Sequence, residues 1–375
     1  MRLAIVRQRY TPFGGAERFV ERAIDALVAR GVKVAIYTRR WPQARDSRIE
    51  PVICNPFYAG SLWRDASFAH AVRAALARDR PELVQSHERI EGCDVFRAGD
   101  GVHRAWLDER IRIGGARARL AIAANPYHRY MIGAEARMFA NPSLKAVICI
   151  SEMVRDDVRR YFPHVEDKLH VIYNAVDARE FSLAVRTDRD ATRAELALTD
   201  DQVAFLLLGS DYSRKGVPTA LRALARLPPE ARLIVVGRDK FPQRYRRLAQ
   251  RAGVAERVIF AGAHKDPRRF LGATDAFVLP TIYDPLSNAV LEALACGLPV
   301  VTSTRCGAGE LVRAHDAGWT CDSQDDAAFA EAMRTLLDAG ERARRSQRAL
   351  AAVATLTPEA MTQRMLDLYA ALLPA

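Results

Sequence analysis

The sequence has few of the features that mark a membrane-spanning, disulfide-linked or zinc-binding protein. It contains no run of about 18 apolar residues, the length that a bilayer-spanning helix requires. The six cysteines are scattered, with no Cys-x-x-Cys pair and no His/Cys cluster, so we expect buried free thiols in a reducing cytoplasm. The first residues, MRLAIVRQRY, lack a small-residue cleavage site and predict a β-strand rather than a signal peptide.

Acidic residues are fewer than basic ones. The chain carries 56 basic and 45 acidic residues, a formal net charge of +11. This excess favours an anionic partner, which includes nucleic acid, a phosphorylated substrate and an acidic membrane surface, and charge alone does not choose among them. With 375 residues, of which 49% are hydrophobic, the chain is long enough for two globular domains.

Short apolar runs alternate with helix-length segments along most of the chain. Strands are expected at 2–6, 32–38, 83–87, 95–99 and 146–151, and again at 203–210, 233–237, 258–262, 276–281 and 299–303. This alternation predicts an α/β protein with two doubly wound, Rossmann-like domains that face each other across a cleft. The expected domains are 1–175 and 176–355, joined by a polar linker around 174–200. A C-terminal helix within 356–375 is expected to pack back on the first domain.

One segment departs from this pattern. In residues 104–130, RAWLDERIRIGGARARLAIAANPYHRY, six arginines are interleaved with apolar residues and only two acidic residues. Such a stretch is typical of an interfacial contact with an anionic membrane. The alternative is an ordinary surface helix pair that is interrupted at Gly114 and Gly115.

Two motifs after expected strands are suited to anion binding. PFGGAER (12–18) places Gly14 and Gly15 between the first strand and a helix, where backbone N–H groups can approach a phosphate, although a plain tight turn would use the same residues. GSDYSRKG (209–216) follows the first strand of the second domain. We expect Arg214 and Lys215 to begin the next helix there and to reach a pyrophosphate.

A third motif, TIYDPLSNAVLEALACGLPVVTS (281–303), combines a loop carboxylate with a helix start. Asn288 is predicted to cap the helix, whose first N–H groups can hold a phosphate. Asp284 can accept hydrogen bonds from sugar hydroxyls, and Glu292 from the two hydroxyls of a ribose. The loop and helix residues expected to line this site are Leu286, Ser287, Asn288 and Ala289.

Taken together, GGAER, VIYNAVD (171–177), GSDYSRKG and DPLSNAVLEALACGLPVV resemble the retaining glycosyltransferases of family 4, which have the GT-B fold. The resemblance covers essentially the whole chain. Within the family, residues 5–41 and the stretch LLLGSDYSRKGVPTALRALARLP are most similar to lipopolysaccharide core glucosyltransferases. The family's Glu-x7-Glu motif is present with Asp284 in its first position and Glu292 in its second.

The resemblance implies roles for these residues. Arg214 and Lys215 would neutralise the diphosphate of a nucleotide sugar, and Glu292 would bind its ribose. Asp284, Gly14 and Gly15 would contact the donor sugar or phosphate. His264 would lie where the nucleobase binds, with the base contacted mainly through the backbone.

The resemblance also implies retention of configuration without a covalent intermediate, with charge neutralisation and positioning as the protein's main contribution. Asp100, Glu17 and His103 are alternative candidates for the group that binds the acceptor or acts as base. Neither a metal nor a cofactor is expected.

The implied activity is transfer of a hexose, expected to be glucose from UDP-glucose, to a glycolipid such as the lipopolysaccharide core. The protein would work on the inner face of the cytoplasmic membrane as a peripheral protein. A sugar-nucleotide epimerase and a non-enzymatic binder of anionic polymers are the alternatives, and nucleic acid is not an expected partner.

Overall fold

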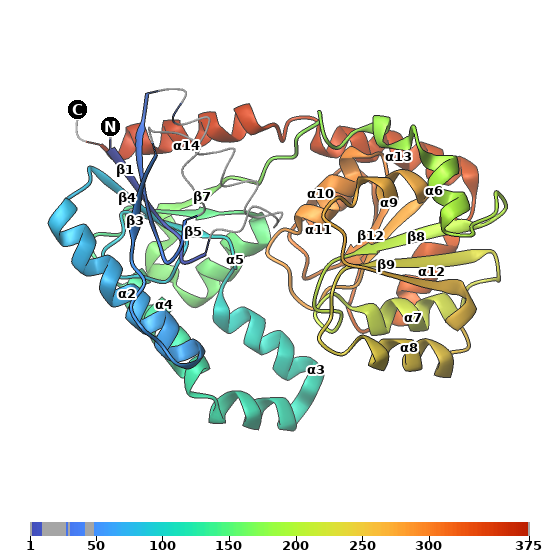
Figure 1. The fold of residues 1–375 in the computed structure, drawn as a ribbon, viewed down its shortest axis with the longest axis horizontal. Helices are drawn as coiled ribbons and strands as arrows, with labels where there is room; N and C mark the ends of the chain where they lie inside the picture. The colour runs from blue at the N-terminus through green and yellow to red at the C-terminus, as the bar shows by residue number, and fades with distance from the viewer. Residues whose placement is uncertain (1, 10–27, 29–30, 42–48, 374–375) are drawn as a thin grey trace. The chain divides into compact units, whose positions relative to one another are not determined.

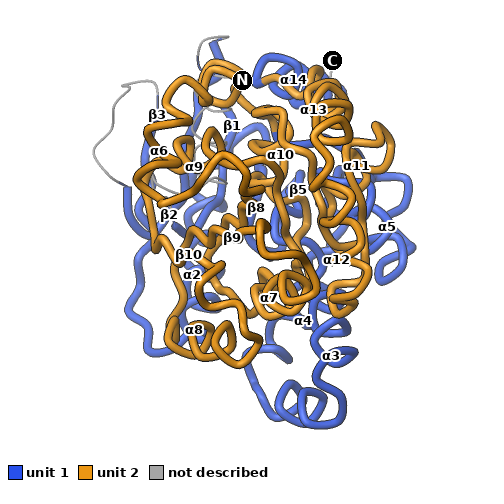
Figure 2. The backbone as a smooth tube through the Cα atoms, turned by 90° about the vertical axis from the view of Figure 1, so that its right-hand side faces the viewer, with its two compact units in different colours: residues 1–174, 358–375 blue, residues 175–357 orange. Residues whose placement is uncertain are grey.

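The structure, a computed structural model, describes residues 2–9, 28, 31–41 and 49–373. The chain forms two compact units, which Figure 2 distinguishes by colour. Unit 1 comprises Met1–Asn174 and Pro358–Ala375, and unit 2 comprises Ala175–Thr357. The last helix therefore belongs to the same unit as the first strand.

Unit 1 is built on a parallel sheet, with seven strands in the described residues, in the order β3-β2-β1-β4-β5-β6-β7. The strands are β1 (Arg2–Val6), β2 (Lys33–Thr38), β3 (Ile49–Ile53), β4 (Leu83–Ser86), β5 (Val95–Ala98), β6 (Ala146–Cys149) and β7 (Leu169–Val171). The chain builds outward from β1 to β3 and then resumes on the other side of β1 with β4. This reversal between β1 and β4 is a topological switch point, where open α/β sheets bind ligands at the carboxyl ends of their strands.

Helices pack against this sheet. They are α2 (Gly60–Asp79), α3 (His103–Ala124), α4 (Pro126–Phe139), α5 (Glu152–Tyr161), the 3-10 turn η1 (Pro163–Lys168) and α14 (Pro358–Leu372). Each presents apolar residues to the core; α14, for example, buries Met361, Met365, Leu368 and Tyr369. Figure 1 shows α2 and α4 running side by side, in keeping with their contacts.

Unit 2 repeats the architecture with a six-stranded parallel sheet in the order β10-β9-β8-β11-β12-β13 within the described chain. Its strands are β8 (Val203–Leu208), β9 (Ala231–Val236), β10 (Val258–Gly262), β11 (Ala276–Leu279), β12 (Val300–Ser303) and β13 (Gly318–Cys321). Runs such as AFVL in β11 are buried at every residue, as expected for a parallel sheet that is covered on both faces. The switch point of this sheet lies between β8 and β11.

Two layers of helices cover the second sheet, as Figure 1 shows. One layer contains α7 (Val217–Ala225), α8 (Pro242–Arg251) and α12 (Asp326–Thr335), and the other contains α6 (Arg189–Glu195), α9 (Arg268–Ala273), α10 (Asn288–Ala295), α11 (Gly309–Ala314) and α13 (Ala339–Val353). The 3-10 turns are η2 (Leu183–Arg186) and η3 (Ala255–Arg257). The ten strands that the sequence predicts are confirmed to within a few residues.

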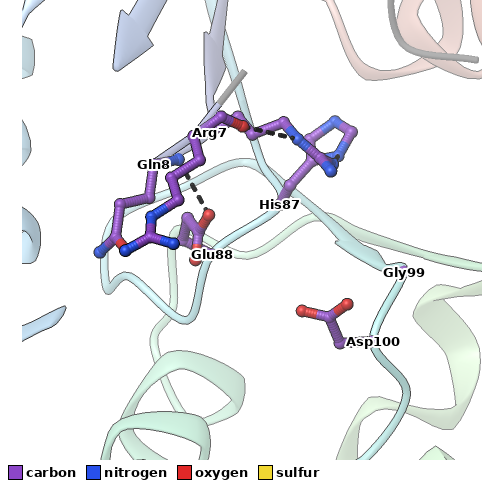
Figure 3. Close-up of a pocket in the computed structure, with 7 residues that line it drawn as sticks. Arg7, Gln8, His87, Glu88, Gly99 and Asp100 are labelled. Atoms are coloured by element: carbon purple, nitrogen blue, oxygen red, sulfur yellow. Dashed lines mark hydrogen bonds between the residues drawn. The ribbon is translucent and has the colours of Figure 1, made fainter. Parts of the chain in front are cut away.

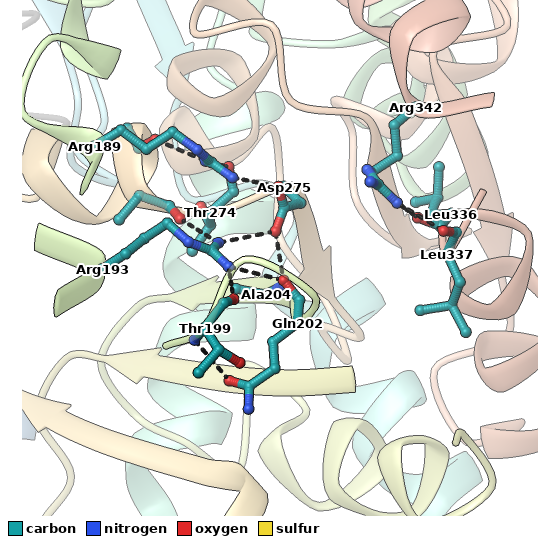
Figure 4. A network of polar contacts seen from close by, with 12 residues as sticks. Arg189, Arg193, Thr199, Gln202, Ala204, Thr274, Asp275, Leu336, Leu337 and Arg342 are labelled. Carbon is teal, nitrogen blue, oxygen red and sulfur yellow. Dashed lines mark hydrogen bonds and ion pairs between the residues drawn. The ribbon is translucent and has the colours of Figure 1, made fainter. Parts of the chain in front are cut away.

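The expected linker at 174–200 is a wrong prediction. This stretch contains η2 and α6, and Arg193 in α6 is only 4% exposed. Arg189 and Arg193 both pair with Asp275, with N–O distances of 2.6 and 3.3 Å (Figure 4). Asp275 also accepts a hydrogen bond from the Ala204 N–H at the start of β8. The polar residues of this stretch are of two kinds: Arg189 and Arg193 bind a carboxylate and backbone carbonyls, whereas others, such as Asp188 and Asp190, are exposed.

Three strands escape prediction for reasons of composition. β3 is partly exposed and contains Pro51, β7 has three residues, and β13 reads GWTC without a β-branched run. All six cysteines are free, and all but the half-buried Cys321 are buried. No helix among the residues that the structure describes has the length and hydropathy to cross a bilayer.

Candidate active site

Two cations and one carboxylate meet at the carboxyl edge of the second sheet, after β8 and β11. Lys215 Nζ lies 2.5 Å from Asp284 Oδ2, and Arg214 Nη1 lies 3.7 Å from the same oxygen. The side chains of Lys215 and Asp284 are each 10% exposed, whereas that of Arg214 is 34% exposed. Asp211 lies 3.9 Å from Arg214 but is mostly exposed, so water screens its charge. Lys215 and Asp284 neutralise each other, and the half-exposed Arg214 gives the cluster an excess of positive charge that favours a further anion.

The pairing controls the ionisation of Asp284. Burial alone would raise its pKa, but the charges of Lys215 and Arg214 and the hydrogen bond from Lys215 outweigh burial and lower it. Asp284 is therefore a carboxylate at neutral pH. Asp284 is the first acidic residue of the motif at 281–303. The sequence does not show that this carboxylate forms an ion pair with Lys215.

Gly216 fixes the turn that carries both cations. Its φ is +75°, and a Cβ atom at this position would lie 1.9 Å from the carbonyl oxygen of Pro280. The Ile282 N–H donates to the Arg214 carbonyl over 2.8 Å, which ties the turn to the segment after β11. The sequence places Arg214 and Lys215 at the start of the next helix. In the structure they lie in the turn just before α7, which begins at Val217.

The helix α10 starts beside this cluster in the sequence. Its N-cap is Ser287, not Asn288 as predicted, and Asn288 is the first helical residue. Ser287 has φ +66°, a left-handed conformation that side chains disfavour, and its hydroxyl makes no capping hydrogen bond. The Val290 and Leu291 N–H groups donate to the Ser287 carbonyl, so the helix turns sharply at its start. The partial positive charge of a helix N-terminus adds to the charges of Arg214 and Lys215.

The Ser287 hydroxyl is buried without a hydrogen-bond partner. The residue is 7% exposed, and Oγ has no donor or acceptor within reach among the described residues. A buried hydroxyl without a partner costs about 1–3 kcal/mol, and this one is available to a ligand at the start of the helix.

The other residues expected at this site differ in how far they are exposed to solvent. Leu286 is buried, and its carbonyl accepts from the Ala308 N–H, while Ala289 is half-buried in the first turn of α10. Glu292 lies one turn further and is 9% exposed. His264 is exposed in the loop after β10, where its Nε2 lies 3.0 Å from the Ala261 carbonyl oxygen and its ring contacts Phe270.

A separate pocket of about 140 Å³ opens at the carboxyl edge of the first sheet (Figure 3). Three strand ends supply its lining, which consists of Arg7, Gln8 and Arg9 after β1, His87 and Glu88 after β4, and Gly99 and Asp100 after β5. The pocket therefore lies at the switch point between β1 and β4. Figure 3 shows the Asp100 carboxylate directed into the pocket, on the side opposite Arg7 and Glu88.

Burial and charge perturb two groups of this pocket. Burial raises the pKa of Glu88, against the effect of the Gln8 N–H, which donates to Glu88 Oε1 over 2.9 Å, and the charge of Asp100 raises it further. Burial also lowers the pKa of His87 well below its usual value, and the charges of Arg97 and Arg7 lower it further. Perturbed titratable groups in a polar pocket at a strand edge are typical of a binding or catalytic site.

The family models match the two halves of the chain. Residues 13–180 match the model of Glycosyltransferase Family 4, and residues 188–351 match that of Glycosyl transferases group 1. The two matches adjoin and together span most of the sequence. The chain belongs to the glycosyltransferases that these two models describe.

Relatives and solved structures agree with this family. The lipopolysaccharide glucosyltransferase WaaG of Escherichia coli is 27% identical over 315 residues, which cover 82% of this chain and 81% of WaaG. A crystal structure of WaaG covers 98% of this glycosyltransferase and 99% of its own chain, with a TM-score of 0.83 and 23% identity. HepE of Anabaena, solved in complex with UDP-glucose, covers 99% and 100% with a TM-score of 0.72 and 18% identity. The fold of the chain is GT-B.

The candidates for acceptor chemistry in this glycosyltransferase are placed differently. Asp100 is exposed in the pocket of unit 1. Gly14, Gly15 and Glu17 lie outside the described residues. His103 begins α3, where its backbone N–H donates to Glu135 and its ring Nε2 lies 3.2 Å from Nδ1 of His128. Burial lowers the pKa of His103 to about 3, and the charge of Arg89 contributes.

The segment 104–130 forms most of α3 and the start of α4. Gly115 has non-helical angles, φ +60° and ψ −146°, so the helix is interrupted where the alternative interpretation, an ordinary surface helix pair, places the break. Beyond this kink the helix is mostly exposed, and Leu120 is 73% exposed. The exposed arginines of the segment are Arg104, Arg112, Arg117, Arg119 and Arg129.

Sequence reasoning missed Arg7, Arg9, His87 and Glu88. They are contributed by two strands that are far apart in the chain, and no fixed spacing connects them. The available signal was that charged or polar residues directly follow the runs RLAIV and LVQS, because the ends of adjacent parallel strands meet at one edge.

Proposed function

We propose that this glycosyltransferase transfers glucose from UDP-glucose to a hydroxyl of a glycolipid of the lipopolysaccharide-core type, with retention of configuration. The observation that carries the proposal is the cluster of Lys215, Arg214 and Asp284 at the switch point of unit 2. The excess positive charge of this cluster, which the half-exposed Arg214 contributes, is suited to the diphosphate of a nucleotide sugar. The likeness to WaaG supports glucose and the lipopolysaccharide core, and that to HepE supports UDP-glucose.

In this proposal each part of unit 2 has one task. Lys215 and Arg214 neutralise the diphosphate, the start of α10 binds the same anion, and Glu292 accepts hydrogen bonds from the ribose hydroxyls. Asp284 positions Lys215 and meets the donor sugar. The remaining donor contacts are assigned to Gly14, Gly15, His264, Leu286, Ser287, Asn288 and Ala289.

The acceptor is assigned to unit 1. A hydroxyl bound in the pocket meets Asp100, which accepts its proton or a hydrogen bond from it, while the departing diphosphate assists deprotonation. Glu17 is the second candidate for this role. Positioning and charge neutralisation then provide most of the rate enhancement, and no metal is required because Arg214 and Lys215 neutralise the leaving group.

We assign the exposed part of α3 to an anionic membrane surface, where the glycolipid acceptor resides. Arg117, Arg119 and Leu120, which are exposed beyond the kink, support this contact. Vesicle sedimentation tests it. The protein should sediment with vesicles that contain anionic lipid and not with neutral vesicles, and an Arg117→Glu/Arg119→Glu variant should remain in the supernatant.

The activity is tested by incubation of the purified protein with a panel of nucleotide sugars and truncated lipopolysaccharide acceptors, followed by mass spectrometry. We expect a single added hexose from UDP-glucose, an α-linkage that preserves the donor configuration, and unchanged turnover in EDTA. Product from another donor would correct the sugar, strict dependence on a metal would contradict the assignment of Arg214 and Lys215, and conversion of the donor without transfer would indicate an epimerase.

Variants test the location of the donor site. Arg214→Ala and Glu292→Ala should abolish stabilisation of the protein by UDP in a thermal-shift measurement. Arg251→Ala, an exposed arginine at the last residue of α8, is the matched control and should retain it. Stabilisation by a short oligonucleotide alone would instead support a polymer-binding protein.

A further inference from the structure

A buried carboxylate on α4 connects segments of unit 1 on either side of the loop that carries Asp100. Glu135 is 1% exposed. Its Oε1 accepts a hydrogen bond from Arg89 Nε over 2.9 Å. Its two carboxylate oxygens lie 3.1 and 3.2 Å from the backbone nitrogen of His103, the first residue of α3. One side chain thus binds both the segment after β4 and the start of α3.

Arg89 extends this connection to the loop itself. Its Nη2 donates to the Gly101 carbonyl over 2.9 Å, and its side chain is 9% exposed. Burial alone would lower the pKa of Arg89, but the charges of Glu135 and Asp100 outweigh burial and raise it. The planar guanidinium binds the carboxylate through one nitrogen and the carbonyl through another, so its orientation is fixed at both contacts.

The loop after β5 presents Asp100 between two glycines. The Gly99 N–H donates to the Arg97 carbonyl over 2.8 Å, and Gly101 has φ +66°, which glycine adopts without strain. The Asp100 side chain is exposed and directed into the pocket (Figure 3). Within the described part of the chain, its carboxylate has no hydrogen-bond or ion-pair partner. Its position is therefore set by the backbone on either side of it.

We propose that Glu135 is a positioning residue which, through Arg89 and the start of α3, fixes the loop after β5 and so holds Asp100 where it meets the acceptor hydroxyl. Strand β5 restrains the loop before Asp100, and the hydrogen bonds to Gly101 and His103 restrain it afterwards. A displacement of about 1 Å at a reacting group can lower the rate by about a hundredfold. This inference rests on the proposed acceptor site.

The contacts of this ion pair favour positioning over a contribution to stability alone. A buried ion pair is weak evidence for net stability, because the cost of desolvation offsets the attraction of the two charges. The backbone groups that this pair binds, the Gly101 carbonyl and the His103 N–H, both lie within three residues of Asp100. The pair therefore acts on the part of the backbone that presents the carboxylate.

Amide hydrogen exchange tests this restraint without reference to activity. Glu135→Gln keeps the shape of the side chain and removes its charge, so Arg89 and the His103 N–H lose a charged acceptor. In the full chain, peptides that cover 99–103 should exchange roughly tenfold faster, while unit 2 is unchanged. Glu91→Gln is the matched control. Glu91 also binds α4, through Arg137 over 2.8 Å, and its loss should leave exchange at 99–103 as in the wild type.

Kinetics test the consequence for the reaction. Glu135→Gln should lower kcat roughly tenfold to a hundredfold, with KM for UDP-glucose unchanged. In an Asp100→Asn background the same substitution should cause no further loss, because residues that act as a unit are not additive. The double variant Arg89→Met/Glu135→Gln leaves no unpaired cation, so its urea midpoint should exceed that of Glu135→Gln while kcat stays low.

Each outcome bears on one part of the inference. Unchanged exchange at 99–103 in Glu135→Gln overturns the restraint of the loop even if the protein is an active transferase. An additive loss in the Asp100→Asn background, or a kcat that recovers together with stability in the double variant, shows a purely structural role and overturns the proposal. Absence of transfer with every donor and acceptor refutes the proposed function, and the exchange measurement then still decides whether Glu135 restrains the loop.

Discussion

The two switch points of the molecule occupy equivalent places in their sheets but carry different side chains. Each lies at the carboxyl edge of a parallel sheet, between β1 and β4 in unit 1 and between β8 and β11 in unit 2. At the second, Asp284 pairs with the buried Lys215 and the half-exposed Arg214, which lie in the turn that Gly216 fixes. At the first, an exposed carboxylate and a neutral imidazole line an open pocket. The second edge therefore presents a paired carboxylate with an excess of positive charge, whereas the first presents side chains of both charges around an open pocket.

The largest effect is expected from Lys215→Met, which keeps an unbranched side chain only one atom shorter and removes its charge. Activity should fall by roughly a hundredfold to a thousandfold, as for loss of a preorganised electrostatic contact. Unfolding free energy should fall by about 3–5 kcal/mol because Asp284 loses its partner. Steady-state kinetics and urea unfolding measure both.

The double variant Lys215→Met/Asp284→Asn separates these two effects. It should recover much of the stability, since no unpaired charge remains, but none of the activity. Recovery of activity in the double variant would contradict a direct role of Lys215 in the reaction.

Asp100→Asn should next reduce kcat by about a hundredfold, the usual contribution of a general base, while the affinity for UDP stays unchanged. This result would assign the two switch points to different substrates. Isothermal titration with UDP and transfer assays measure the two quantities. Asp167→Asn, an exposed carboxylate of the same unit, is the control and should behave as the wild type. Weakened UDP binding in Asp100→Asn would remove the distinction between the two edges.

A smaller effect is expected from Ser287→Gly. Glycine adopts φ +66° without strain and removes the unpaired hydroxyl, so the unfolding free energy should rise by about 1 kcal/mol. If the hydroxyl binds the diphosphate, UDP affinity should fall by roughly fivefold at the same time. Urea unfolding with and without UDP measures both changes. A variant that is more stable and binds UDP as tightly as the wild type would show that this hydroxyl has no role in donor binding.

The smallest effect concerns pH. Because the pKa of Asp284 is lower in the folded protein than in the unfolded chain, its ionisation stabilises the fold above about pH 4, the ordinary range of an aspartate. That contribution is lost as the pH falls through the folded-state pKa. The stability difference between the wild type and Asp284→Asn should therefore shrink steadily below pH 4 in unfolding measurements. A difference that is constant between pH 6 and pH 3 would show that the carboxylate is not stabilised by Lys215.

The sequence was informative where the relevant residues are contiguous. Buried runs such as VAFLLL and AFVL predict the strands of unit 2, because both faces of a parallel sheet exclude water. The sequence also indicates which charged residues lie near a strand end. Arg214 and Lys215 follow one predicted strand in a single segment, and Asp284 and Glu292 follow another.

Prediction failed where the structure depends on distant pairing. The salt bridge from Lys215 to Asp284 joins positions 69 residues apart, and the bond from Tyr369 to Gln85 joins positions 284 apart. Arg193 was assigned to a linker because composition does not show that it forms an ion pair with Asp275. The left-handed conformation of Ser287 was also unforeseen, since nothing local to a serine requires it.

The contact between Gly216 and Pro280 has a genetic consequence. Every amino-acid replacement of glycine adds a Cβ atom, and here that atom would meet a backbone carbonyl that cannot move aside. Missense changes of this codon should therefore displace the loop that presents Arg214 and Lys215 while the core strands remain intact. In a random mutant library selected for loss of transfer but normal expression, codon 216 should be among the positions recovered repeatedly, whichever residue replaces glycine.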